Sequence, residues 1–389
     1  MSNTWKIYML AFIGFIVGTS EFVIAGILDK VASSANISVS AAGQLITVFS
    51  IAYAFGPPLV MMAAAKMDRR KLLMLSLAIL VLGSVLTVAL SSLVYLIAAR
   101  VVLGVGTGVF IISAMTVAPK LASHERQARA IATVISGFSA SLIIGVPIGR
   151  VVAEAYDWKV IFWGIGLISL LAIFAIARTI PAFEAEAQVP LSKQLALLKK
   201  PNIAIALGVT FFVFIGYSVV NTFLTPFLYT VSSMSEREIS VVFFALGIAS
   251  LIGSKFGGFL ADRIGATRTL TGSMAIQVVA LALLSTMSGS VVATITLIML
   301  WTIAAWSFGT TQNFNLASLA PDASGIMLSL NSSFLQFGIA AGAGIGGIVV
   351  GSSSILAICW IGAASVAIAV LIWAISISLT QTSRQSVFD

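Results

Sequence analysis

Twelve long apolar segments constrain this 389-residue chain more than any other feature of its sequence. Each is close to the ~20 residues that an α-helix needs to cross the hydrocarbon core of a bilayer. We therefore expect an all-α integral membrane protein with twelve transmembrane helices. The predicted spans are residues 7–28, 40–65, 72–90, 93–116, 130–152, 160–178, 203–229, 239–260, 270–288, 291–312, 327–350 and 353–379.

The composition supports this interpretation. Hydrophobic residues make up 59% of the chain and charged residues only 9%, against about 25% charged residues in a typical soluble domain. A surplus of this size must face lipid. The net charge of +8 alone would fit nucleic-acid binding, but the basic residues are scattered over short loops. We therefore expect no nucleic-acid partner.

The basic residues also predict the orientation, because Lys and Arg concentrate in cytoplasmic loops. With an even number of spans, both termini lie on the same side, and Lys6 and Arg384 flank them. The loops on that side hold most basic residues: Lys66, Arg69, Arg70, Lys71, Lys120, Arg126, Arg129, Lys193, Lys199, Lys200, Arg263 and Arg268. The opposite side holds Lys30, Lys159 and Arg237, with Arg150 near a span end. Both termini are therefore expected to be cytoplasmic.

The chain also repeats itself at about half its length. Asp68-Arg69 follows the second span and Asp262-Arg263 follows the eighth, 194 residues later. A second echo, 197 residues apart, pairs Gly145 and Gly149 with Gly342 and Gly346. Repeats of this kind are typical of transporters whose halves surround a site near the bilayer midplane.

The repeat predicts two pseudo-symmetric six-helix bundles in one chain. The N-terminal bundle is expected to cover residues 1–178 and the C-terminal bundle residues 203–389. Residues 179–202, rich in proline and charge, are expected to form a cytoplasmic linker between them.

Glu21 is the only one of thirteen acidic residues deep inside a span. A charged side chain at membrane depth costs about 2.5–3.5 kcal/mol on insertion scales, so it usually marks an ion or substrate path. Glu21 shares a small-residue stripe with Gly14, Gly18 and Ala25. Such stripes allow close helix packing, so we expect the carboxyl to face the bundle. It could carry protons; the alternative is a permanently protonated structural carboxyl.

Arg100 is the only basic residue well inside a span. Glu21 lies seven residues from the predicted outer end of its span, and Arg100 lies eight residues after Ser92, near which its own span begins. At 1.5 Å per residue, both sit about 11 Å below the outer surface. The two side chains could sense each other's charge. The alternative is that Arg100 braces the fold by donating to backbone carbonyls.

Several motifs resemble those of the major facilitator superfamily. The segment Gly258-Phe259-Leu260-Ala261-Asp262-Arg263-Ile264-Gly265 resembles its G-x-L-A-D-R-x-G signature, although the first-half loop around Asp68 lacks the glycines. Arg100 to Gly106 resembles R-x-x-x-G-x-G, and Gly145 to Gly149 resembles the antiporter element G-x-P-x-G. Gly18 to Phe22 is similar to the first span of bacterial efflux pumps for purines, arabinose-like sugars and phenicols. The purine pumps are also matched through Ala42-Gly43-Gln44-Leu45 and Ala320-Pro321-Asp322.

The resemblance implies the major facilitator fold in a bacterial plasma membrane, and it implies roles for two groups of residues. The first is a gate at cytoplasmic helix ends, formed by Asp68, Arg69, Asp262, Arg263, Gly258 and Gly265. The alternative is that these charges only set membrane topology. The second group, Gly145, Pro147 and Gly149, removes bulk and one backbone donor, which favours close packing and a bend.

Polar and aromatic residues inside the spans are candidates for substrate binding. They are Tyr53, Phe138, Tyr217, Asn221, Trp306, Gln312 and Asn331. Amides and aromatic rings could hydrogen-bond and stack a flat neutral heterocycle such as a purine. The alternative for each is ordinary packing between helices.

These features favour a proton-coupled exporter of small organic molecules over an intramembrane enzyme or a receptor, and a receptor would not need the half-length repeat. An intramembrane hydrolase would show histidine or paired acids inside spans, and the single histidine lies in a loop. No phosphate-binding G-x-x-x-x-G-K-[ST] loop is present, so an ion gradient is the expected energy source. We expect no cofactor or metal and a monomer whose partners are a small-molecule substrate, protons and the bilayer. Uptake, or uniport by the same fold, stays an alternative.

Overall fold

A computed structural model describes residues 3–64, 67–89, 92–123, 126–183, 196–232, 234–286, 290–320 and 323–385. Within these ranges every regular element is helical. Four features singled out in the sequence lie outside the described residues: Lys66, the single histidine His124, the middle of the linker at residues 184–195, and Pro321-Asp322.

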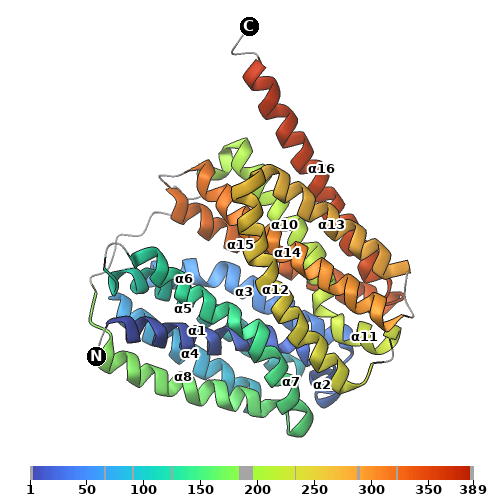
Figure 1. Cartoon of the computed structure of the whole chain (residues 1–389). Helices are drawn as coiled ribbons and strands as arrows, with labels where there is room; N and C mark the ends of the chain where they lie inside the picture. The colour runs from blue at the N-terminus through green and yellow to red at the C-terminus, as the bar shows by residue number, and fades with distance from the viewer. Residues whose placement is uncertain are drawn as a thin grey trace. The chain divides into compact units, whose positions relative to one another are not determined.

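The expectation of twelve spans is confirmed. Twelve helical segments of the described chain are long and apolar enough to cross a membrane. Eleven of the spans are formed by one uninterrupted helix each, labelled in Figure 1: α1 (Asn3–Gly26), α3 (Val39–Ala63), α4 (Arg69–Ala89), α5 (Leu93–Lys120), α8 (Lys159–Thr179), α10 (Pro201–Thr222), α12 (Glu236–Ile264), α13 (Ala266–Thr286), α14 (Val291–Leu319), α15 (Ser324–Ser352) and α16 (Ala357–Gln385). The fifth span combines α6 (Gln127–Ala140), a π-helical turn (Ser141–Gly145) and α7 (Val146–Ala155).

The seventh span is shorter than predicted. The sequence predicts a continuous span to residue 229, but α10 ends at Thr222 and a separate short helix, α11 (Leu224–Ser232), follows. Phe223 leaves the helical conformation at φ −107° and ψ 18°. Its fully buried ring fills the space left by Gly346, where a Cβ would lie 2.7 Å from the ring. Packing of this one side chain accompanies the break.

The first span has a matching break. Helix α1 ends at Gly26, Ile27 has φ −123° and ψ 24°, and the short helix α2 (Leu28–Ser34) follows. Ile27 and Phe223 are 196 residues apart, close to the spacing of the sequence repeat. The two halves of the chain therefore also share a break in their first helix at equivalent positions.

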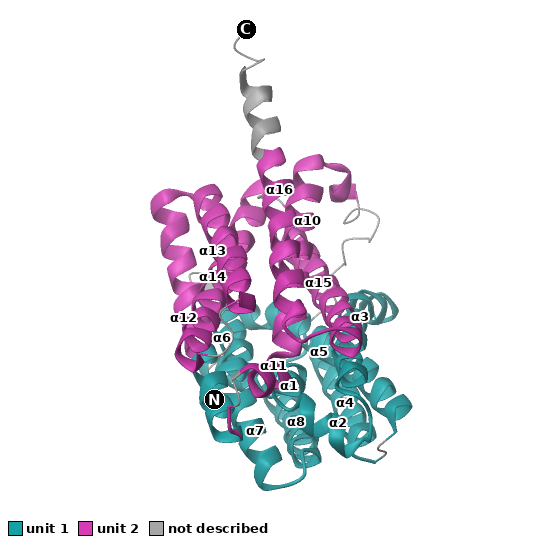
Figure 2. Ribbon diagram, turned by 90° about the vertical axis from the view of Figure 1, so that its right-hand side faces the viewer, with its two compact units in different colours: residues 1–188, 236–247 teal, residues 189–235, 248–389 magenta. Residues whose placement is uncertain are grey.

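Contacts divide the chain into two compact units, coloured separately in Figure 2. Unit 1 comprises residues 1–188 and 236–247, and unit 2 comprises residues 189–235 and 248–389. Helix α12 thus contributes its first turns to unit 1 and its remainder to unit 2. The division into six-helix bundles at residues 1–178 and 203–389 stays a prediction.

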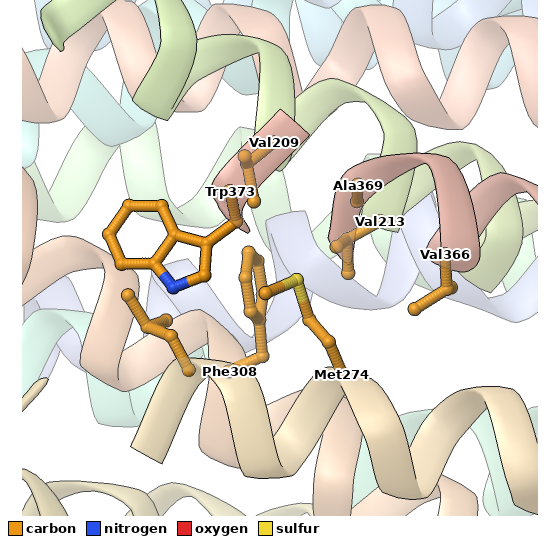
Figure 3. Packing of buried hydrophobic residues seen from close by; sticks show 8 residues of the cluster. Val209, Val213, Met274, Phe308, Val366, Ala369 and Trp373 are labelled. Carbon is orange, nitrogen blue, oxygen red and sulfur yellow. The ribbon is translucent and has the colours of Figure 1, made fainter. Parts of the chain in front are cut away.

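The two units use equivalent packing partners. In unit 1, α4 packs on α5 and α8, and α1 packs on α6. In unit 2, α13 packs on α14 and α16, and α10 packs on α15. The core of unit 2 in Figure 3 joins four helices through side chains that include Val209, Met274, Phe308, Val366 and Trp373. The Trp373 indole donates a hydrogen bond of 3.2 Å to the Thr271 hydroxyl.

The repeated glycines lie at helix contacts, as their pattern predicts. A Cβ on Gly145 would collide with Thr19 Oγ1, and one on Gly149 with Val23. In unit 2, a Cβ on Gly342 would lie 2.5 Å from the Ile215 carbonyl oxygen. The glycines of the fifth and eleventh spans therefore let α7 approach α1 and α15 approach α10 in the same way.

Candidate functional site

Arg100 is the eighth residue of α5, two turns from its start, and is 2% exposed. Its guanidinium donates to three backbone carbonyl oxygens: to Ser20 at 2.9 Å, to Glu21 at 3.4 Å and to Leu45 at 3.5 Å. Its central carbon lies 4.5 Å from the centre of the Phe49 ring. One buried cation therefore ties α5 to both α1 and α3, which is the bracing role that the sequence left open.

Glu21 lies beside this cation, as the depth argument predicts. The Arg100 guanidinium bonds to the backbone of residue 21, and the Glu21 carboxyl interacts with it electrostatically. Glu21 is partly buried in α1. Helix α1 thus presents a titratable carboxyl next to a fixed positive charge.

The glycines that precede Glu21 set how closely α1 approaches α6. A Cβ on Gly18 would lie 2.8 Å from the Phe138 carbonyl oxygen, and one on Gly14 would lie 3.5 Å from that of Val134. The small-residue stripe therefore packs against the backbone of α6. Phe138 itself, a predicted substrate residue, makes an edge contact with the Phe22 ring at 5.4 Å between centroids.

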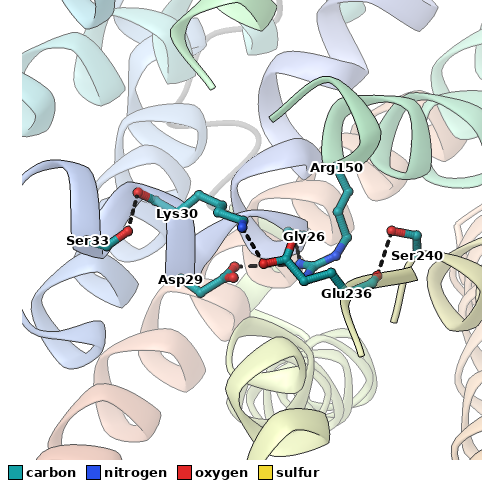
Figure 4. Close-up of polar contacts among 7 residues, drawn as sticks. All are labelled: Gly26, Asp29, Lys30, Ser33, Arg150, Glu236 and Ser240. Atoms are coloured by element: carbon teal, nitrogen blue, oxygen red, sulfur yellow. Dashed lines mark hydrogen bonds and ion pairs between the residues drawn. The ribbon is translucent and has the colours of Figure 1, made fainter. Parts of the chain in front are cut away.

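A second cluster of charged residues in unit 1 includes Arg150, as Figure 4 shows. Arg150 is fully buried in α7, donates to the Gly26 carbonyl oxygen at 2.6 Å, and has Nη1 3.6 Å from Asp29 Oδ1. Next to it, Lys30 forms an ion pair with Glu236, the first residue of α12. The sequence placed Arg150 only near a span end. Asp29, the residue that follows the predicted first span, is the partner that could have suggested a buried role.

The predicted gate residues lie at helix ends. Asp68 precedes α4 and accepts a 3.0 Å hydrogen bond from the Lys71 backbone N–H, as a helix-capping carboxylate does. Asp262 and Arg263 are exposed in the last turn of α12. Gly265 makes the turn into α13 with φ +88°, a left-handed conformation that favours glycine.

In unit 2, Tyr217 lies at the centre of an aromatic cluster. Its ring stacks on Trp301 at 5.3 Å between centroids and contacts the edge of Phe214 at 6.0 Å. Its hydroxyl bonds to the Trp306 side chain, whose indole N–H donates. Two of the predicted residues, Tyr217 and Trp306, are thus brought together. Trp301 was missed, since a buried tryptophan in an apolar span gives no separate signal.

Gln312 and Asn331 belong to a buried hydrogen-bond network. Gln312 Nε2 donates to the Ala206 carbonyl oxygen at 2.7 Å and to Thr210 Oγ1 at 3.0 Å. Thr210 donates to Asn331 Oδ1 at 2.8 Å, and Asn331 donates to Asn313 at 2.8 Å. The network links α10, α14 and α15. This geometry favours the packing interpretation for these two amides.

The remaining candidates have simpler surroundings. Tyr53 is nearly buried in α3, with its ring 6.4 Å from that of Phe49. Asn221 is partly buried near the end of α10. Among the residues that the structure describes, no three His, Cys, Asp or Glu side chains are grouped as a metal site would require.

Comparison with known proteins agrees with this architecture. The family model described as "Major Facilitator Superfamily" matches residues 10–323 and 206–387. The chain is 48% identical over 371 residues to the uncharacterized MFS-type transporter YbcL of Bacillus subtilis (strain 168), covering 95% of each chain.

Solved structures show the same fold at low sequence identity. A bacterial homologue of the human lysosomal transporter Spinster, in an inward-facing and unoccupied conformation, gives a TM-score of 0.72 at 16% identity, covering 96% of this chain and 95% of that one. The structure of the nucleoside transporter NupG gives a TM-score of 0.74 at 14% identity, and the match covers 96% of this chain and 100% of that one. With twelve candidate spans, a matching family model and a relative of nearly equal length, the chain belongs to the Major Facilitator Superfamily and is a multi-pass transporter of the bacterial plasma membrane.

Proposed function

We propose that this transporter exports small organic molecules in exchange for protons by alternating access, with both termini in the cytoplasm. Glu21 is the group that binds and releases the proton. The observation that carries the proposal is the placement of Glu21 beside Arg100, a buried cation fixed by three carbonyl oxygens. A carboxyl at membrane depth is expensive, so its presence there calls for a function.

Arg100 gives the exchange a physical basis. A nearby cation favours the charged carboxylate, whereas desolvation favours the protonated form. When substrate or water enters, the balance between these two effects changes. Proton release from Glu21 can then be linked to the occupancy of the substrate site.

For the substrate, we propose purine bases, nucleosides or related drugs. The aromatic cluster of Tyr217, Trp301 and Trp306 supports this class, because stacked rings with a polar edge suit flat heterocycles. Arabinose-like sugars and phenicol antibiotics are the second class to test, on the resemblance of Gly18 to Phe22.

The test uses purified protein in liposomes that contain a pH-sensitive dye. A proton gradient is imposed, and purine bases, nucleosides, arabinose or chloramphenicol are added to wild type and to Glu21→Gln. We expect substrate-dependent proton movement in wild type and background movement in the variant, with substrate binding retained. Glu154→Gln is the matched control, since Glu154 is an exposed carboxyl in α7.

Two results would contradict the proposal. Full active efflux by Glu21→Gln would show that another group carries the proton. Flux of radiolabelled substrate without any proton movement in wild type would identify a uniporter and make Glu21 a structural residue.

A further inference from the structure

A cavity of about 530 Å³ opens at one end of unit 1. It is formed by the first turns of α1, the end of α5 and the start of α6. The polar side chains that line it come from Thr4, Tyr8, Lys120, Ser123, Arg126, Arg129 and Thr133. Its lining residue closest to Glu21 along α1 is Tyr8, 13 residues away, and the one closest to Arg100 along α5 is Lys120, 20 residues away. The transport proposal makes no use of this cavity.

The charged side chains that line the cavity in the described part of the chain all have one sign. Lys120, Arg126 and Arg129 contribute three positive charges, and the described residues that line the cavity include no carboxylate. Arg126 and Arg129 are exposed, so their guanidinium groups are accessible to a ligand. The Thr133 hydroxyl bonds within its own helix, to the Arg129 carbonyl oxygen at 2.8 Å. A cavity of this kind suits an anion with several acceptor oxygens, because guanidinium groups bind phosphate with two parallel hydrogen bonds.

The neighbouring face of α1 indicates that the anion belongs to a lipid. Trp5, Tyr8 and Phe12 are 45%, 60% and 56% exposed, and their spacing places them on one side of the helix. Tryptophan and tyrosine are enriched where a membrane protein meets the headgroup layer. Since Tyr8 also lines the cavity, the cationic cavity lies directly beside an exposed aromatic stripe that acyl chains can cover.

We propose that this cavity binds the phosphate of an anionic membrane lipid. The phosphate pairs with Arg126 and Arg129, and the acyl chains lie along Tyr8 and Phe12. Basic pockets between transmembrane helices on the cytoplasmic side suit such headgroups, and the basic loops predict that this end of the chain is cytoplasmic. A lipid bound here would hold the ends of α1, α5 and α6 together.

The experiment measures lipid binding directly, without transport. Full-length protein in neutral detergent is titrated with phosphatidylglycerol or phosphatidylcholine, and bound lipid is counted by native mass spectrometry. Wild type is expected to bind phosphatidylglycerol in preference. Arg126→Gln/Arg129→Gln is expected to weaken that binding by about thirtyfold, since each basic residue near an anionic surface contributes about fivefold.

The matched control is Lys199→Gln/Lys200→Gln, which removes two exposed charges just before α10 and should leave binding unchanged. If the double arginine variant does not fold, Arg126→Gln alone should lose about fivefold. Equal loss in the control would overturn the proposal, as would equal binding of both lipids. Inorganic phosphate is the third probe: if it displaces phosphatidylglycerol at similar concentration, the site is one for a soluble anion and the lipid proposal fails.

Discussion

Arg100 combines two roles that the sequence presented as alternatives. Its guanidinium bonds to carbonyl oxygens of α1 and α3, which makes it a brace, and one of those carbonyls belongs to Glu21. The brace therefore holds a positive charge against the backbone of the residue that carries the titratable carboxyl. Any change that frees the guanidinium should affect stability and proton coupling together.

Replacing Arg100 separates these roles. Arg100→Gln removes the charge and leaves buried carbonyl oxygens without their donor, at about 1–3 kcal/mol for an unsatisfied buried group. Arg100→Lys keeps the charge but lacks the planar fork that reaches three acceptors. We expect both variants to unfold at lower temperature, and only Arg100→Lys to retain proton-coupled transport. Thermal unfolding and the pH dependence of transport measure the two effects. A purely structural Arg100 would leave that pH dependence unchanged in both variants.

The sequence located the two charged residues but could not identify their neighbours. Counting residues along a helix gives depth, so Glu21 and Arg100 could be placed at one level. Which side of the helix meets which partner depends on packing. Phe49 beside Arg100 and Trp301 beside Tyr217 therefore came only from the structure. For the same reason, Gln312 and Asn331 read as substrate candidates, although their amides bond within the protein.

At the scale of helices, hydropathy predicts where spans lie but not where they break. The twelve spans follow from the length of apolar runs. The break at Phe223 has no proline or glycine at the break itself, and the break at Ile27 directly follows Gly26. They accompany tertiary packing, such as the Phe223 ring against Gly346. The wide turn at Ser141–Gly145 is different, because Pro147 follows it and removes a backbone donor.

Gly145 tests the close approach of α7 to α1. A Cβ there would collide with the hydroxyl oxygen of Thr19, so Gly145→Ala should destabilise the protein by about 1–3 kcal/mol, the usual cost of overpacking. Gly164→Ala in α8 is the matched control, because nothing lies within 4 Å of its Cβ position. It should be neutral or stabilising by about 0.5–1 kcal/mol, as alanine favours helix.

Thermal unfolding in detergent compares these variants. Adding Thr19→Ala to Gly145→Ala removes the colliding atom and should restore part of the lost stability. If Gly145→Ala and Gly164→Ala have the same unfolding temperature, the fifth span does not depend on this contact.

At the scale of the whole molecule, α12 is a helix whose residues are divided between the two units. One continuous helix contributes residues 236–247 to unit 1 and its remainder to unit 2. Its first residue, Glu236, pairs with Lys30, next to the buried Arg150 and its partner Asp29. The half-length repeat in the sequence predicts two similar halves. It does not reveal this attachment, because neither Lys30 nor Glu236 belongs to a repeated motif.

The Lys30–Glu236 pair should therefore hold the start of α12 against unit 1. Both side chains are partly exposed, at 28% and 33%, so the pair itself contributes at most about 1 kcal/mol. Lys30→Glu or Glu236→Lys instead places like charges together beside Asp29 or Arg150. We expect each single reversal to lower the unfolding temperature and slow transport in liposomes, and the double exchange to restore both. A double exchange as impaired as the single variants would mean that each side chain acts through its own surroundings, with no contribution from the pair.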